Sequence, residues 1–479
     1  MSERLSSADT AFFYVERPDT PQHVGGLAVF AAPDGFDYDR LLRLLDERIS
    51  LAPRYRQKMR TVPGNLANPV WLDDSKFDLT YHVRRSGLHR PGRDAALLEF
   101  CARIQSRLLD RSRPLWEMYL VEGLADGRVA VITKTHPAIV DGDGGIDITQ
   151  VLLDESPEPR RTVAPQWRAR REPSGLRLMA EAVCDTVRSP AVLIDAARLS
   201  GRDARTSAKS AVGAVSGVAA SVGGSVLGAA RHSERSPLRA KLGKHRRIAI
   251  ERARLADFRR VRDRRGGTVN DVVLAVVAGA LRAWLLSRRE PLVQSSTVRA
   301  LVPIGVNGPD APSPGWTRAS RVTGVLVDLP VGEPDPLRRL ALIQQTMQTQ
   351  AVSGHPVGAD VLAGLSGFAP PTLHSLGVRA AQGLARRQYS VVVTNVPGPQ
   401  LPRYAAGARM TEMFPILPLN SGQALAIAAT SYNGGVYFGV NADRDAVPDV
   451  DLVASSLGTA IDQLVAASTP VDIGSGAPR

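Results

Sequence analysis

Apolar residues recur at helical spacing in the first part of the chain. Leu41, Leu44, Leu45 and Ile49 repeat with the period of a helix, and Pro53 interrupts the pattern. A second helix is predicted over residues 94–109. Because such helices carry one apolar face, we expect them to pack on a sheet.

A strand-like alternation of apolar and polar residues follows the second helix. Trp116, Met118 and Leu120 alternate with polar neighbours, an Asp-Gly turn comes at residues 126–127, and residues 128–135 alternate again. This pattern predicts a β-hairpin. The stretch THPAIVDGDGG, residues 135–145, therefore begins at the C-terminal end of a strand.

The second half of the chain again mixes helices and strands. Thr268 and Asp271 form a capping-box pattern before a helix that is apolar on nearly all sides, so we expect that helix to be buried. The stretch SVVVTNVPGPQ, residues 390–400, predicts a strand that runs into a Pro-Gly loop, and Asn433-Gly434 predicts a hairpin turn. The sequence therefore predicts an α/β (mixed α+β) fold with two lobes.

The composition changes between the predicted lobes. Residues 156–244 begin with a stretch rich in Pro and Arg, and we interpret them as the connection between an N-terminal lobe, residues 1–155, and a C-terminal lobe, residues 245–479. Within the connection, residues 210–230 are uncharged and long enough to span a bilayer. Their Ala, Gly and Ser contribute little transfer free energy, so a flexible helix or a lipid-contacting segment is preferred to a transmembrane helix.

The composition and the net charge indicate in which cell compartment the protein lies and which classes of partner it can bind. Cys101 and Cys184 lack disulfide or zinc-site spacing, and no secretory signal is visible, so we expect a cytoplasmic protein. The net charge is +13, and only six of the 60 basic residues are lysines. Nucleic acid, an anionic membrane face and a phosphate-bearing ligand all fit this charge. Residues 244–265 are basic but contain interleaved acids and few aromatics, so we predict a solvated helix face and no nucleic-acid site.

His136 and Asp141 are the candidate chemical pair. A histidine at a strand end, followed by Asp-Gly on a tight turn, can present an imidazole base while the aspartate turns inward. The alternative is a Gly-rich turn with solvated carboxylates. The run fails the EF-hand pattern, and the other histidines lack metal-ligand spacing, so we predict no metal site.

Several segments together resemble the bacterial wax ester synthase/acyl-CoA:diacylglycerol acyltransferase (WS/DGAT) family of the actinobacterial type. They include LSSADTAFFYVE, RSRPLWEMYLVEGL, HPAIVDG, TVNDVVLAVVAGALR and VVVTNVPGPQ. The resemblance implies a two-lobed, chloramphenicol-acetyltransferase-like fold with a tunnel between the lobes. It also implies transfer of a long-chain acyl group from acyl-CoA to diacylglycerol, giving triacylglycerol, or to a fatty alcohol, giving wax ester. Acyl-CoA is then a substrate, and no further cofactor is implied.

The family's HHxxxDG motif has its general base at the second histidine. Aligning Asp141-Gly142 places the first histidine at His136 and the base position at Pro137, which has no proton acceptor on its side chain and no backbone N–H. The resemblance gives catalytic positions to His136, Asp141 and Gly142. It gives substrate-binding positions to Pro114, Leu115, Trp116, Asn270, Asp271, Asn395, Pro397 and Gly398.

Pro137 leaves two hypotheses for the function. The first is an acyltransferase with reduced or altered activity, and the second is a catalytically silent paralogue that binds acyl-CoA or neutral lipid. Adjacent positions on an extended strand point to opposite faces, so we expect His136 not to replace the missing base without a rearrangement. Insoluble substrates and the basic charge predict peripheral binding to the inner face of the cell membrane or to lipid inclusions.

Overall fold

The computed structural model describes residues 3–33, 36–140, 148–160, 167–188, 236–306, 321–353 and 388–469. Asp141, Gly142 and the uncharged stretch 210–230 lie outside them.

The N-terminal lobe is built on a six-stranded sheet with the order β12-β13-β2-β7-β6-β5. Only the β5–β6 pair is parallel. A small sheet, β1-β4-β3, lies beside it. The strands are β1 (Glu3–Arg4), β2 (Val24–Ala31), β3 (Gln57–Arg60), β4 (Val70–Asp73), β5 (Val83–Gly92), β6 (Trp116–Leu124), β7 (Arg128–Thr135), β12 (Tyr404–Ala405) and β13 (Ala408–Ile416).

Helices cover both faces of this sheet, as the alternation in β7 requires. Val129 and Val131 pack in one apolar cluster with α2, whereas Ala130 and Ile132 pack in another with α4. The helices of this lobe are α1 (Ser7–Val15), α2 (Tyr38–Arg48), α3 (Leu79–His82), α4 (Asp94–Gln105), α5 (Pro137–Val140), α6 (Ile148–Leu152) and α7 (Gly175–Arg188). The predicted β6–β7 hairpin is confirmed.

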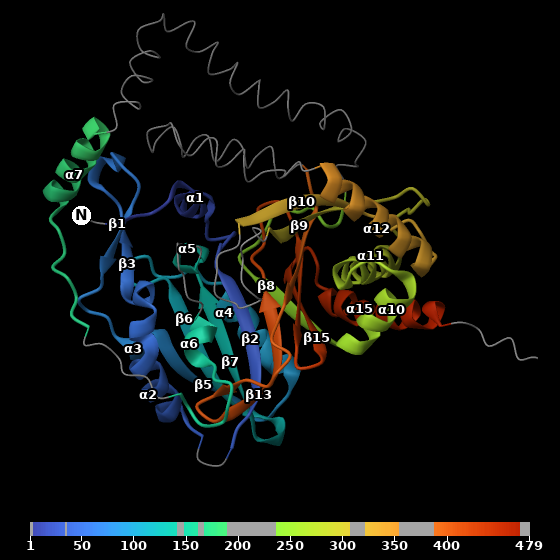
Figure 1. The fold of residues 1–479 in the computed structure, drawn as a ribbon, viewed down its shortest axis with the longest axis horizontal. Coiled ribbons are helices and arrows are strands. Elements are labelled where there is room, and N and C mark those ends of the chain that lie inside the picture. The colour runs from blue at the N-terminus through green and yellow to red at the C-terminus, as the bar shows by residue number, and fades with distance from the viewer. Residues whose placement is uncertain are drawn as a thin grey trace, which may run out of the picture.

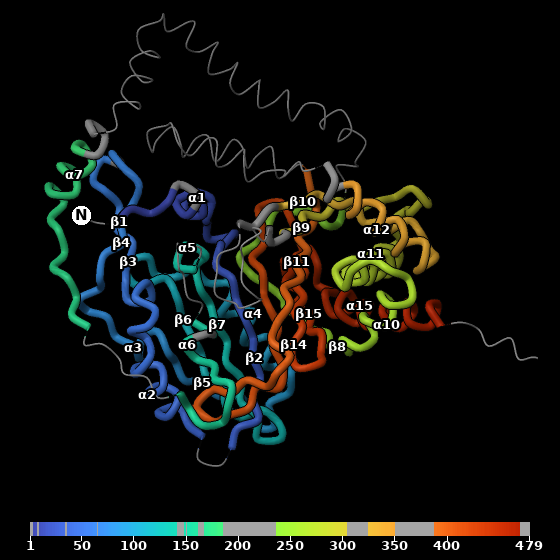
Figure 2. The backbone as a smooth tube through the Cα atoms, in the orientation of Figure 1, coloured from blue at the N-terminus to red at the C-terminus, as the bar shows by residue number. Residues whose placement is uncertain are grey.

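The C-terminal lobe is a second six-stranded sheet with the order β10-β9-β11-β14-β15-β8. Its strands are β8 (Arg246–Arg254), β9 (Val298–Val306), β10 (Arg321–Leu329), β11 (Val391–Pro397), β14 (Leu425–Tyr432) and β15 (Gly435–Asp443). Its helices are α10 (Leu255–Arg265), α11 (Val269–Ser287), α12 (Pro336–Ser353) and α15 (Val450–Ser468). Figure 2 shows the two large sheets side by side, with these four helices on the outer side of the second.

Sequence signals explain the local structure of the C-terminal lobe. Thr268 and Asp271 form the predicted reciprocal capping box of α11, and the helix is buried as expected. Asn433 and Gly434 both have positive φ in the hairpin between β14 and β15. Helices α11 and α15 are long and apolar enough to cross a membrane by composition, but they form the core of this lobe.

Residues 244–265 do not form the single solvated helix face that we predicted. Residues 246–254 form strand β8, which pairs with β15, and only the part from Leu255 is helical. Ile248 is buried against the N-terminal lobe, so burial of alternate apolar residues outweighed the helical propensity of the arginines.

One strand from late in the chain joins the two lobes. Strand β13 leaves the C-terminal sheet and pairs antiparallel with β2, with Ile416 opposite Gly25 (Figure 1). The close approach of the lobes requires a glycine, because a Cβ at Gly439 on β15 would lie 1.9 Å from the Pro415 carbonyl oxygen. The domain ranges 1–155, 156–244 and 245–479 stay a prediction. Strand β13 lies in the third range of the sequence but belongs to the sheet of the N-terminal lobe.

Candidate active site

The chain leaves strand β7 at Thr135 and turns at once into the short helix α5. The His136 N–H donates to the Leu115 carbonyl oxygen at 3.0 Å, and the His136 carbonyl accepts from the Ile139 N–H at 3.0 Å. Pro137 is the first residue of α5, where the missing N–H leaves no intrahelical bond unmade. Proline therefore fits this backbone without strain.

Our expectation that His136 and Pro137 are neighbours on an extended strand is wrong. The strand ends one residue earlier, and His136 occupies the N-cap of α5. Its Nδ1 accepts a hydrogen bond from the Ala138 N–H at 3.2 Å. The imidazole thus caps the helix in the way that a Ser, Asp or Asn side chain ordinarily does.

Aromatic residues of α1 enclose the His136 ring. The ring stacks on Phe13 at 4.3 Å between centroids and meets the edge of Phe12 at 6.1 Å. Only 1% of His136 is exposed. Burial, together with a smaller effect of the nearby Arg111 guanidinium, lowers the pKa of His136 to about 3. The ring is therefore neutral at physiological pH.

A neutral imidazole that accepts at Nδ1 carries its proton on Nε2. Hence its one basic lone pair is already used by the Ala138 N–H. Nε2 is buried and has no partner among the described residues. To act as a general base, His136 must give up the helix cap and leave its aromatic enclosure. The arrangement makes His136 a packing and capping residue.

The Pro114-Leu115-Trp116 segment supports this turn from the neighbouring strand. The Leu115 carbonyl holds the His136 N–H, and Trp116 Nε1 donates to the Tyr55 carbonyl oxygen at 2.8 Å. The Trp116 ring stacks on His82 at 4.8 Å. All three residues of the segment are buried. Their substrate-binding role stays a prediction; in the structure they brace the motif turn.

A buried ion pair that the sequence did not reveal lies one residue before Thr135. Lys134 Nζ is 3.8 Å from Glu117 Oε2, and the Tyr119 hydroxyl donates to the same carboxylate oxygen at 2.8 Å. Burial lowers the pKa of Lys134 to about 8 despite the opposing effect of Glu117. The sequence could have indicated this pair only if the residues of β6 and β7 had been aligned across the predicted hairpin, where Glu117 lies opposite Lys134.

The predicted residues of the C-terminal lobe come together at a cavity of about 810 Å³. It lies where the N-terminus of α11 meets the C-terminal end of β11. Predicted residues that line it are Asn270, Asp271, Asn395, Pro397 and Gly398. Further lining residues that the sequence did not single out include Arg259, Met347, Gln348, Gln400 and Ser431. His136 is not part of the lining of this cavity.

Two amide side chains meet in the wall of this cavity. Asn395 Nδ2 lies 3.5 Å from Asn270 Oδ1, at the outer limit of a hydrogen bond. The Asp271 carboxylate is directed to the helix cap, where it accepts from the Thr268 N–H at 2.8 Å. Asp271 therefore holds α11 in place, and the two asparagines are left to face the cavity.

No three His, Cys, Asp or Glu side chains in the described part of the chain lie close enough to hold a metal ion.

Two family profiles cover most of the chain. The wax ester synthase/diacylglycerol acyltransferase catalytic domain matches residues 5–273, and the WS/DGAT C-terminal domain matches residues 320–465. The chain is 31% identical to the probable diacylglycerol O-acyltransferase tgs1 of Mycobacterium tuberculosis H37Rv, over 97% of this chain and 96% of that protein. It is 32% identical to tgs2 of the same strain, over 95% and 97%.

Solved structures agree with the sequence comparison. The wax ester synthase/diacylglycerol acyltransferase from Marinobacter aquaeolei VT8 superposes with a TM-score of 0.66 at 28% identity, covering 97% of this chain and 99% of that one. The first condensation domain of the CDA synthetase has a TM-score of 0.56 at 14% identity, over 99% of this chain and 98% of that one, which is a likeness of fold alone. The predicted two-lobed α/β fold is confirmed. This chain belongs to the WS/DGAT family of acyl-CoA-dependent O-acyltransferases.

Proposed function

We propose that this chain binds a long-chain acyl-CoA together with diacylglycerol or a fatty alcohol and transfers the acyl group slowly, without a histidine base. The acceptor hydroxyl oxygen attacks the thioester carbonyl carbon, the carbon–sulfur bond breaks, and the hydroxyl proton ends on the sulfur of CoA. The products are the ester and free CoA. No imidazole takes part in moving that proton.

The geometry of His136 is the observation that carries this proposal. Its Nδ1 lone pair caps α5, and the next residue is Pro137 at the first helical position. General-base assistance contributes about 10²- to 10⁴-fold to a rate. Alignment of thioester and hydroxyl in a site that excludes water contributes separately. The expected activity is therefore low and not zero.

The test is transfer from a labelled long-chain acyl-CoA to diacylglycerol and to a long-chain alcohol. We expect Pro137→His to raise the rate about 10²- to 10⁴-fold, because it restores an imidazole at the family's base position. His136→Asn is the matched control, since Asn keeps a cap acceptor but has no basic nitrogen. We expect its rate to equal that of the native chain. A native rate that His136→Asn abolishes would show that His136 is the base and would contradict the proposal.

The second candidate function is a silent binder of acyl-CoA or neutral lipid. The missing base at Pro137 is the observation that favours it. The same assay separates the two, because a silent binder gives no product above the uncatalysed rate even at high protein concentration. Retention of acyl-CoA without turnover would support this second candidate.

We further propose that the protein binds lipid surfaces peripherally from the cytoplasmic side. Both acceptors are insoluble, and the net charge is +13. Leu176 and Val183, two exposed apolar side chains of α7, add a means of contact. Sedimentation with phosphatidylglycerol vesicles, reversed by salt, is the expected result. A chain that stays in the supernatant at low ionic strength would refute this.

A further inference from the structure

Helix α7 carries apolar side chains on two faces, and only one face is packed against the protein. Leu178 and Ala182, four residues apart, are buried in a cluster with residues of the small sheet. Leu176 and Val183, seven residues apart, share a different face of the helix, where they are 79% and 55% exposed. Packing on the lobe therefore explains one apolar face of α7 and leaves the other open in the described part of the chain.

The exposed apolar face of α7 is more than a pair of isolated side chains. Met179 lies between Leu176 and Val183 at helical spacing and is half-buried. Leu66, which is 47% exposed, follows the short helix Pro63–Asn65, and that helix contacts α7. Single exposed apolar residues are common on protein surfaces, whereas several together mark a surface that binds a partner.

Two arginines next to α7 have no ion pair among the described residues. Arg168 and Arg171 lie in the segment that leads into the helix, and both are exposed. The two acids of residues 167–184 are neutralised by other cations. Their ion pairs are Glu172–Arg60, at 3.0 Å, and Glu181–Arg177, at 3.1 Å. The surroundings of the apolar face therefore keep an excess of positive charge.

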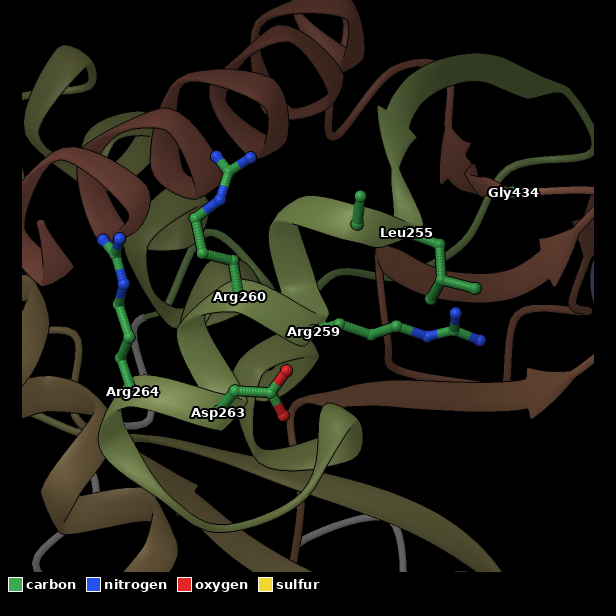
Figure 3. A pocket seen from close by; sticks show the side chains of 7 residues that line it. Leu255, Arg259, Arg260, Asp263, Arg264 and Gly434 are labelled. Carbon is green, nitrogen blue, oxygen red and sulfur yellow. The ribbon is translucent and has the colours of Figure 1, made fainter.

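Helix α10, by contrast, offers positive charge without an exposed apolar face. Arg259, Arg260 and Arg264 line a cavity of about 440 Å³ beside it. Figure 3 shows Arg260 and Arg264 on a different side of the helix from Arg259, so these guanidinium groups do not converge. The large apolar residues of α10 are all buried: Leu255, Phe258 and Val261. Helix α7 is therefore the better candidate for a partner that is both apolar and anionic.

The two helices lie far apart, and α7 is held in a fixed direction. Figure 1 shows α7 at the outer end of the N-terminal lobe and α10 at the far side of the C-terminal lobe. Leu178 is buried against Val62, Val70 and Leu72, which fixes the outer face of α7 relative to the lobe. A flat surface that contacts α7 therefore leaves α10 in water.

We propose that α7 is the helix through which this protein docks on an anionic bilayer. Leu176, Met179 and Val183 enter the headgroup region, and Arg168 and Arg171 bind lipid phosphates. The assignment rests on the proposed binding of lipid surfaces and states which face makes the contact. Interfacial helices bind through buried apolar area together with attraction to anionic lipid. A second copy of the chain could cover the apolar face, but it would not require unpaired arginines beside that face.

A cysteine on α7 gives a direct test of this assignment. Cys184 follows Val183 and is exposed, whereas Cys101 is fully buried, so a thiol-reactive NBD dye labels position 184. We expect the NBD fluorescence to rise severalfold when phosphatidylglycerol vesicles are added, because the dye leaves water. The matched control combines Cys184→Ser with Ala256→Cys, which moves the dye to an exposed position on α10. Its fluorescence should stay unchanged.

Substitutions in the apolar face test the inserted side chains. Leu176→Ser combined with Val183→Ser should weaken partition into phosphatidylglycerol vesicles about 10- to 100-fold, because two large apolar side chains no longer leave water. The matched control is Leu401→Ser, which replaces an equally exposed leucine of the C-terminal lobe. We expect this control to change partition less than twofold.

Substitutions of the unpaired arginines test the phosphate contacts separately. Arg168→Ala combined with Arg171→Ala should weaken partition about tenfold at low salt and have little effect at high salt, where electrostatic attraction is screened. Arg260→Ala combined with Arg264→Ala removes the same charge from α10. This second pair should change partition less than twofold.

The possible failures have different meanings. If the native chain sediments with the vesicles and the Leu176→Ser, Val183→Ser variant sediments equally well, α7 is not the docking helix, although the proposed lipid binding stands. An NBD signal that rises on α10 and not on α7 would have the same meaning. If the native chain is a dimer without lipid and this variant is a monomer, the apolar face joins two copies and the assignment is wrong. A native chain that binds no vesicles would refute the proposed lipid binding itself.

Discussion

The end of β7 and the cavity of the C-terminal lobe use their polar side chains in opposite ways. At the end of β7, His136 Nδ1 accepts a hydrogen bond from the first turn of α5, and the His136 ring stacks on Phe13. At the cavity, Asn270 and Asn395 make only one long contact with each other, and Arg259 makes none that the structure describes. Polar groups that are hydrogen-bonded within the protein stabilise the fold, whereas polar groups without a protein partner are available to a ligand. The two groups of residues lie in different lobes, so the absence of a histidine at position 137 leaves the lining of the cavity unchanged.

The largest expected effect is on stability at the β7 side. Trp116→Ala should lower the free energy of unfolding by about 3–5 kcal/mol, because it empties a buried site and removes one of the two rings that stack on His82. Urea denaturation measures this loss. Arg259→Ala in the exposed wall of the cavity should change the same quantity by less than about 0.5 kcal/mol. Similar losses of unfolding free energy in Trp116→Ala and Arg259→Ala would contradict the contrast between the buried turn and the cavity wall.

The helix cap should account for part of the stability at His136. His136→Ala removes both the cap and the ring, and we expect a loss of about 2–4 kcal/mol. His136→Asn keeps an acceptor for the Ala138 N–H, so it should be about 1 kcal/mol more stable than the alanine variant. Equal midpoints and slopes for the two variants in urea would show that the hydrogen bond to Nδ1 contributes nothing.

Acid should destabilise the native chain through its buried histidines. The pKa of His136 falls to about 3 and that of His82 to about 4, both mainly through burial. The unfolded chain binds these protons below about pH 6.5, but the native chain does not. The contribution of these histidines to the free energy of unfolding is therefore complete above pH 6.5. As the pH falls toward 4, the free energy of unfolding declines by up to about 1.4 kcal/mol per pH unit for each histidine. A slope that His136→Asn leaves unchanged would contradict the neutral, buried ring.

The smallest expected effect is the coupling between the two cavity asparagines. Asn270→Ala, Asn395→Ala and the double variant form a cycle, and their unfolding free energies should reveal a coupling below about 0.5 kcal/mol. The reason is the 3.5 Å separation, which is at the edge of hydrogen bonding. A coupling above about 1.5 kcal/mol would mean that these amides are committed to each other, as His136 is to α5.

Local patterns in the sequence predicted most helices, strands and turns. The contacts between segments that are distant in the sequence could not be predicted in this way. The capping box at Thr268 and the Asn433-Gly434 turn are encoded by neighbouring residues, so they were visible without a structure. The Leu115 and Phe13 contacts of His136 come from other parts of the chain. The strand β8 was missed because its arginines obscured an alternation that only pairing with β15 makes meaningful.

The cavity was predicted only in part for the same reason. Asn270 and Asn395 were predicted because each lies in a recognisable sequence motif. No pattern of neighbouring residues in the sequence connects them with Arg259, which lines the same cavity. An arginine without a partner is recognised only when the partners of the other arginines are known. Solvent exposure and missing counter-charges are properties of the folded chain, so the sequence could not distinguish Arg259 from the eight other arginines of residues 246–265.

Strand β13 also sets the order of events during synthesis. The N-terminal sheet has β2 as an incomplete edge until residues 408–416 have been made and have left the ribosome. The first lobe therefore cannot finish folding before most of the second has been translated, and its unpaired edge must be protected from other chains in the meantime. A fragment that stops at residue 244 should accordingly aggregate, whereas one that extends to residue 469 should fold.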